Sequence, residues 1–132
     1  NYAANNGGAV SINSGTVLNC NFTGNIAKND GGAVYLGYPS NVANCHFADN
    51  SAKDGGALYF LNDNDNVINC SFVANEADSR GGAVFFMTNQ QVNATNCYFE
   101  GNYASTEPGC INNCGCLIVY NTTFYKNLYV TH

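Results

Sequence analysis

Apolar and polar residues alternate along several short stretches of the chain. In residues 18–22, Leu18, Cys20 and Phe22 alternate with asparagines, and residues 43–47 and 68–72 repeat this order. Alternation with a period of two is typical of β-strands that bury one face. Gly, Asn and Asp separate these stretches, and no segment has apolar residues at helical spacing. The pattern therefore predicts an all-β protein built from short strands.

The strands belong to a repeat of about 25 residues. A Gly-Gly-Ala-Val/Leu block begins at residues 7, 31, 55 and 81, and an Asn-Cys-x-Phe block follows each one. A fifth, altered copy reads Asn-Thr-Thr-Phe at residues 121–124. Strands that recur with no helix between them predict coils stacked at the strand spacing of about 4.8 Å. We predict a parallel β-helix of about five coils in a single domain, residues 1–132, with the right-handed coil that parallel crossovers favour.

Equivalent positions of the repeat are expected to form columns along the stack. Inward phenylalanines supply buried area, and asparagines at a turn hydrogen-bond to their copies in neighbouring coils. The Gly-Gly pair provides a backbone conformation, or a close approach, that a side chain would forbid. The predicted columns are Phe22, Phe47, Phe72, Phe99 and Phe124; Cys20, Cys45, Cys70 and Cys97; and Asn25, Asn50, Asn75, Asn102 and Asn127.

A further column is aromatic in the middle of the chain. Tyr35, Tyr59 and Phe85 each stand three residues after the second glycine, between more strongly apolar neighbours. Because those neighbours are the better core residues, we predict an exposed aromatic stripe. One interpretation is a ladder that packs on itself and stabilises the stack. The other is a contact site for another chain or a platform on which a sugar stacks.

The chain has seven cysteines, of which four form the inward column. We interpret that column as buried thiols, with a disulfide along the stack as the alternative. The other three, Cys110, Cys114 and Cys116, lie close together in the fifth copy. A local disulfide among them is the preferred prediction for an oxidising compartment. A three-sulfur metal site is less favoured because no fourth ligand is near, and the odd count leaves open a free thiol or an intermolecular bond.

Charge is sparse and acidic. Nine acidic and four basic residues give a net charge of −5, which argues against binding to nucleic acid or to an anionic membrane. No run of 18 apolar residues predicts insertion into a bilayer.

Candidate chemistry is equally sparse. Asp30, Asp54 and Asp78 are candidates for a glycosidase or lyase carboxylate pair, but Lys28, Lys53 and Arg80 accompany them and favour a solvated charged edge. Residues 62–66 (Asn-Asp-Asn-Asp-Asn) resemble a calcium loop but favour a solvated turn. His46 has no nucleophile near it in sequence, and His132 is terminal. We predict no catalytic residue, no metal and no cofactor.

Four Asn-x-Ser/Thr sequons, at Asn21, Asn69, Asn93 and Asn121, are possible glycosylation sites. We expect Asn21, Asn69 and Asn121 to share an outward position of the repeat.

The two alternating blocks, Gly-Gly-Ala-(Ile/Leu/Val) and Phe-x-x-Asn, resemble the repeats of the chlamydial polymorphic outer-membrane proteins. Similar repeats occur in adhesin-like surface proteins of methanogenic archaea and some protists. The resemblance covers essentially the whole chain and implies a right-handed β-helical segment at a cell surface, active in adhesion or as structural bulk. The regular cysteines and the Thr122 of the fifth copy depart from that pattern.

The sequence therefore predicts a non-enzymatic, extracellular structural or adhesive module, forming a stalk or adhesin segment. Its expected partners are other chains, further coils of the same protein or surface glycans. Because the repeat begins within a copy at Asn1, we expect the rod to continue into further coils. One alternative is a filament subunit that stacks end to end. A second alternative is a β-helical carbohydrate-active enzyme or sugar-binding module.

Overall fold

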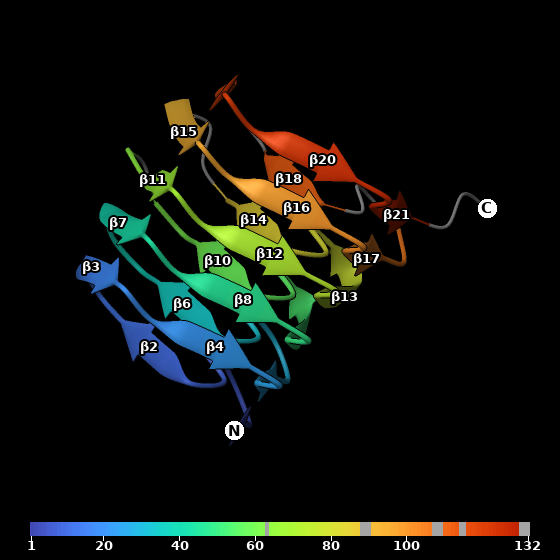
Figure 1. The fold of residues 1–132 in the computed structure, drawn as a ribbon. Helices are drawn as coiled ribbons and strands as arrows, with labels where there is room; N and C mark the ends of the chain where they lie inside the picture. The colour runs from blue at the N-terminus through green and yellow to red at the C-terminus, as the bar shows by residue number, and fades with distance from the viewer. Residues whose placement is uncertain (63, 88–90, 107–109, 114–115, 130–132) are drawn as a thin grey trace.

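The computed structural model describes residues 1–62, 64–87, 91–106, 110–113 and 116–129, which wind into a β-solenoid of about five coils (Figure 1). All strand pairs are parallel and join a strand of one coil to its counterpart in the next. The predicted all-β parallel β-helix is confirmed, whereas its handedness stays a prediction. Each coil passes through four parallel sheets, which we call walls A to D.

The strands of each wall follow one another along the stack. Wall A contains β1 (Tyr2–Ala3), β5 (Ile26–Ala27), β9 (Ser51–Asp54), β13 (Glu76–Arg80), β17 (Tyr103–Ala104) and β21 (Leu128–Tyr129). Wall B contains β2 (Val10–Ile12), β6 (Val34–Leu36), β10 (Leu58–Phe60), β14 (Val84–Phe86) and β18 (Ile111–Asn113). Wall C contains β3 (Gly15–Leu18), β7 (Ser40–Ala43), β11 (Asn66–Ile68), β15 (Gln91–Thr95) and β19 (Cys116–Tyr120). Wall D contains β4 (Asn21–Thr23), β8 (His46–Ala48), β12 (Ser71–Val73), β16 (Tyr98–Glu100) and β20 (Thr123–Tyr125).

The core is a set of apolar columns, each contributed by one position of the repeat. The Phe column of wall D stacks nearly face to face, with ring centroids 4.7 Å apart and planes 4° apart for Phe72 and Phe99. Phe60 and Phe86 of wall B form a second stack, also with centroids 4.7 Å apart. Valines of wall C complete the interior. Burying the rings of Phe22, Phe47, Phe72 and Phe99 at the strand spacing is the main apolar contribution to the stack.

Three of the four corners of a coil have a residue in the left-handed region wherever the structure describes them. At the corner between walls C and D that residue is the asparagine before the Cys column, with φ of 54° at Asn19 and 55° at Asn44. Asparagine tolerates this conformation better than other residues with a side chain. The corner between walls D and A uses mixed residues, including Gly24 and Ala74. The fourth connection, between walls B and C, is the loop whose length varies from coil to coil.

The Gly-Gly pair forms the corner between walls A and B. Each of its two positions excludes a side chain for a different reason. The first, exemplified by Gly31, has a φ of 65°, where a side chain would be strained. The second, Gly32, lies so close to the next coil that a Cβ would overlap the carbonyl oxygen of Gly56 and the backbone of Ser51. The two predicted explanations are thus both correct, one for each position.

Within the described part of the chain, no helix is long and apolar enough to cross a membrane.

We expect Gly32→Ala to destabilise the solenoid by about 3 kcal/mol or more, because the added methyl group would force two coils apart where both backbones are fixed. Gly24→Ala is the matched control, since its Cβ would meet nothing within 4 Å and Ala74 occupies the equivalent corner. It should cost about 1 kcal/mol from its left-handed conformation alone. Urea unfolding would measure both, and equal losses would contradict the close-approach explanation.

Candidate functional site

The inner asparagines form a continuous hydrogen-bonded ladder at the corner between walls D and A. Asn50 Nδ2 donates to Asn75 Oδ1 (2.9 Å) and to the carbonyl oxygen of Phe22 (3.0 Å). Its Oδ1 accepts from both the backbone N–H (2.9 Å) and Nδ2 (3.0 Å) of Asn25. Asn50, Asn75 and Asn102 therefore each have both amide donors and the acceptor satisfied. The same pattern runs from Asn1 through Asn127, so this column is structural.

The inward cysteines are also hydrogen-bond donors. Cys70 Sγ lies 3.2 Å from the carbonyl oxygen of Ile68 and 3.6 Å from that of Val42, and Cys45 and Cys97 repeat this pair of contacts. In the fifth coil Thr122 replaces the cysteine, and its Oγ1 lies 2.9 Å from the carbonyl oxygen of Tyr120. At this position of the repeat, both Cys and Thr supply a small side chain that donates a hydrogen bond to a backbone carbonyl oxygen.

All cysteines of this column are free thiols, as the preferred interpretation predicts, and no disulfide runs along the stack. Desolvation raises the pKa of Cys45 and Cys97, and it raises the pKa of Cys70 to about 12. Because the thiolate is the reactive form, these thiols are chemically inert near neutral pH.

Cys110 lies in the inner column of Gly-Gly-Ala alanines, in line with Ala83, and is buried. It is a free thiol, so the predicted disulfide does not include it, because its side chain points into the core. Cys114 and the side chain of Cys116 lie outside the described residues, so a bond between those two stays a prediction.

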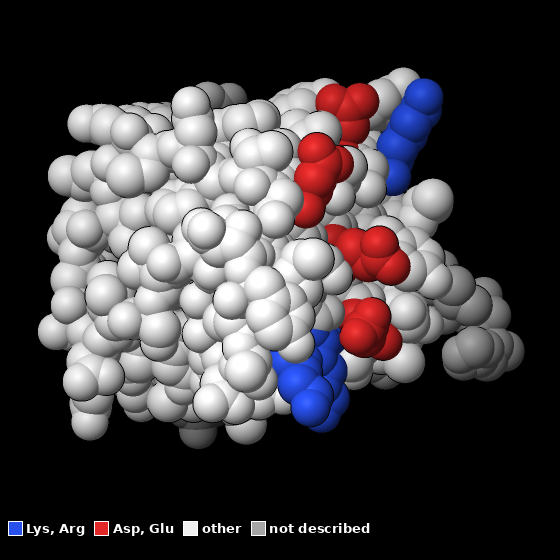
Figure 2. Space-filling view, turned by 90° about the horizontal axis from the view of Figure 1, so that it is seen from below, with Lys and Arg blue, Asp and Glu red and all other residues white. Residues whose placement is uncertain are grey.

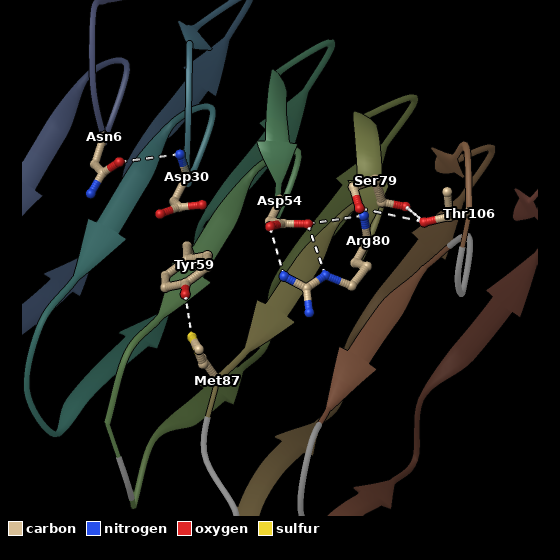
Figure 3. A network of polar contacts seen from close by, with 8 residues as sticks. All are labelled: Asn6, Asp30, Asp54, Tyr59, Ser79, Arg80, Met87 and Thr106. Carbon is tan, nitrogen blue, oxygen red and sulfur yellow. Dashed lines mark hydrogen bonds and ion pairs between the residues drawn. The ribbon is translucent and has the colours of Figure 1, made fainter.

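The prediction that the aromatic column is exposed is wrong for Tyr59 and Phe85. Tyr35, Tyr59 and Phe85 do stack as one column on the outer side of wall B, but Tyr59 is only 5% exposed and Phe85 is fully buried. Neighbouring segments cover these rings: the guanidinium carbon of Arg80 lies 4.5 Å from the Phe85 ring centroid. Tyr59 Oη donates to Met87 Sδ (2.8 Å; Figure 3). The self-packing interpretation fits this arrangement, and an open sugar platform does not.

The three candidate carboxylates near the Gly-Gly corner differ in their surroundings. Arg80 binds Asp54 through two contacts, Nε to Oδ1 (3.1 Å) and Nη2 to Oδ2 (2.9 Å), and Asp54 is only 4% exposed (Figure 3). Desolvation and the charge of Asp54 raise the pKa of Asp30. Asp78 is exposed on wall A. One view of the molecule shows that charged side chains there keep to a narrow band and leave the remaining surface uncharged (Figure 2).

The acidic loop at residues 62–66 is tied to the neighbouring coil. Asp65 is buried, and its Oδ1 accepts from the backbone N–H of Ser40 (2.8 Å). Asn62 Nδ2 donates to the carbonyl oxygen of Gly37, whereas Asp63 lies outside the described residues. Among the described residues, no three His, Cys, Asp or Glu side chains gather as metal ligands would. The predicted solvated turn is therefore wrong for Asp65, which acts as a link between coils.

One polar pair was not predicted from the sequence, because its two residues belong to different coils. His46 Nδ1 and Ser71 Oγ lie 2.5 Å apart on the outer face of wall D, although 25 residues separate them. The equal register of β8 and β12 brings them together, and the repeat period could have revealed this pairing. The neighbouring residues of this outward column are Asn21, Tyr98 and Thr123.

Two rows of hydrogen-bonded asparagines on the outer surface were also not predicted from the sequence. On wall C, Asn66 Nδ2 donates to Asn41 Oδ1 (2.9 Å), and Asn93 Nδ2 donates to Asn66 Oδ1 (3.0 Å). At the adjoining corner, Asn69 donates to Asn44 (3.2 Å) and Asn121 donates to Asn96 (2.7 Å). The sequence signal was the asparagine before each Cys or Thr, which recurs in all five copies.

The predicted shared position of the sequons Asn21, Asn69 and Asn121 is wrong for Asn21, which pairs with His46 on wall D because it follows the Cys column instead of preceding it. Asn69 and Asn121 do belong to the corner row, and the fourth sequon, Asn93, belongs to the row on wall C. Asn21 is exposed on wall D, outside both rows. Glycosylation of all four remains a prediction.

Replacing Asn75 by alanine should destabilise the protein by about 4 kcal/mol, because several buried partners, including the Phe47 carbonyl and the Asn50 amide, lose their hydrogen bonds. Asn66→Ala in the same turn of the solenoid removes a similar amide row at the surface and should cost less than about 1 kcal/mol. Thermal or urea unfolding of the two variants measures the difference. A similar loss of unfolding free energy for both variants would show that burial does not determine how much an amide ladder stabilises the protein.

The cysteine column predicts sensitivity to alkali. Folding raises the pKa of Cys70 from 9.0 to about 12, so its contribution is fully present below pH 9 and is lost as the pH rises toward 12. Cys70→Thr, which copies the natural Thr122 of the fifth coil, removes this ionisation and should lose less stability over that interval. Urea unfolding at several pH values between 8 and 11 tests this, and parallel pH profiles for the two proteins would contradict it.

The chain is similar to one known repeat family. The model of the Chlamydia polymorphic membrane protein repeat matches residues 19–37 and 44–61, which run from the corner before wall D through wall B in two successive coils. No curated protein and no solved structure shows significant similarity to the chain. The resemblance predicted from the Gly-Gly-Ala and Phe-x-x-Asn blocks is confirmed over two copies of the repeat: residues 19–37 and 44–61 match the Chlamydia polymorphic membrane protein repeat.

Proposed function

We propose that the chain is a non-enzymatic segment of a cell-surface stalk or adhesin, located outside the cell. The observation that carries the proposal is the match of two successive coils to a repeat of membrane proteins. The coils outside the matched residues have the same strand register, so the same columns of side chains continue through them. Surface proteins of this repeat type supply the expectation of an extracellular location.

The roles of the recurring side chains within the coils support a structural function. The Phe, Cys and inner Asn columns are all engaged in packing and in hydrogen bonds between coils. Of the three carboxylates considered for a catalytic pair, Asp54 binds Arg80, Asp78 is exposed on wall A, and Asp30 lies beside the ion-paired Asp54. The ion pair of Asp54 favours the structural proposal over the enzyme alternative.

A stack of this kind suits a spacer. Five coils at the strand spacing give a rod of roughly 24 Å, and each added coil lengthens it by about 4.8 Å. Ladders of buried amides and rings connect every described coil to the next, so a pull along the axis must break many contacts together.

The filament alternative is favoured by one observation. In the coil formed by β18 to β21, Phe124 and Val119 occupy inner columns but are 48% and 39% exposed. A further coil in the same register, from the same chain or from another, would cover them. Sedimentation of the purified chain tests the filament alternative: concentration-dependent growth supports it, whereas a monomer at all concentrations rules it out.

Antibodies raised against the purified solenoid test the proposed location. Intact cells of the source organism should be labelled as strongly as permeabilised cells, and protease added outside should remove the signal. A cytoplasmic marker protein serves as the control for membrane integrity. Labelling that requires permeabilisation would rule out a surface stalk or adhesin.

A further inference from the structure

The outer face of wall C combines an amide row with an apolar row. Along each strand, outward residues alternate with the inward valine column, so two outward columns cross the wall parallel to the solenoid axis. The first is Thr16, Asn41, Asn66, Asn93 and Ile118. The second is Leu18, Ala43, Ile68, Thr95 and Tyr120. The corner asparagines follow as a third column, so amides border the apolar row on both sides.

The amides of this wall are held in place before any ligand arrives. Asn66 donates to Asn41 and accepts from Asn93, which leaves one N–H and one oxygen lone pair of Asn66 for a ligand. Asn69 and Asn44 are joined in the same way at the corner. Ordered donors and acceptors bind without the usual loss of side-chain freedom. The apolar row between them is accessible, with Leu18 49% and Ile68 36% exposed.

The wall is also uncharged. Its strands, residues 15–18, 40–43, 66–68, 91–95 and 116–120, contain no Asp, Glu, Lys or Arg, although the chain has a net charge of −5. A sulfated or carboxylated ligand would find no cation on these strands. Asp65 precedes β11, but it is buried and accepts from the backbone N–H of Ser40, so the strands present no exposed anion to a cationic ligand either. The charge pattern therefore selects a neutral ligand that is rich in hydrogen-bonding groups.

The size of the wall distinguishes a glycan from a protein partner. Five strands at about 4.8 Å and about four residues per strand at 3.3 Å give roughly 300 Å². A stable protein interface needs about 800 Å² on each partner, so a second copy would bind weakly through this face alone. A single extended polysaccharide chain fits a strip of this width.

We propose that the outer face of wall C binds a neutral, extended β-linked polysaccharide lying along the solenoid axis. The C–H faces of successive sugars pack on the row of Leu18 and Ile68, and their hydroxyl groups exchange hydrogen bonds with the amides on either side. Because the amides recur at the strand spacing, the contacts accumulate along the rod, and affinity grows with the number of coils. This inference rests on the proposed adhesive function and names the class of ligand.

Native electrophoresis of the 132-residue chain through gels containing hydroxyethylcellulose, galactomannan or cereal β-glucan tests the inference. At least one of these neutral polysaccharides should retard the chain, and retardation should persist in high salt. Ile68→Lys and Asn66→Ala should each weaken the binding by about tenfold or more. Val73→Lys is the matched control, because Val73 faces outward on wall D of the same coil and should leave retardation unchanged.

Unfolding curves of the three variants establish that each is folded. No retardation by any of the neutral polysaccharides would overturn the inference, as would equal effects of Ile68→Lys and Val73→Lys. Retardation only by heparin, lost in high salt, would overturn the choice of a neutral ligand. If Ile68→Lys instead abolishes self-association in sedimentation, wall C is a protein interface. Antibody labelling of intact cells is independent of these results, so a surface location can hold while the ligand assignment fails.

Discussion

The structure depends on one constraint: successive coils must keep the strand spacing on all four walls at once. The corner between walls A and B sets the closest approach, because Gly32 there lies against the backbone of both the next coil and wall A. Once that approach is made, parallel hydrogen bonds form along every wall, and equivalent side chains fall directly above one another. Ring stacking at 4.7–5.1 Å in the Phe column and the continuous amide ladder are consequences of this spacing.

The repeat period and the two-residue alternation were sufficient to predict the fold and its inner columns. Phe72 and Asn75 could be assigned because an inward position in one coil is inward in all coils. The chemistry of the columns was harder to foresee. A thiol that donates to two carbonyl oxygens has no distinct sequence signal until Thr122 is recognised as its substitute.

Outer surfaces were predicted less well, for a physical reason. Whether an outward side chain is exposed depends on which loops cover it, and Arg80 and Met87 cover the column of Tyr59 and Phe85. Alternation distinguishes the two faces of a strand but contains no information about such cover. Contacts between coils, such as His46 with Ser71, require the register of the strands, which loops of unequal length conceal.

Thr122 in the cysteine column has a consequence for where such a protein can be made. The column holds protonated donors and contains no cross-link among its described cysteines. Its formation therefore needs neither an oxidant nor a disulfide isomerase, and once buried its thiols resist mispairing in an oxidising space because they are seldom ionised. A chain of this kind can be synthesised in a reducing compartment and exported to an oxidising one without any change in the chemistry that holds its coils together.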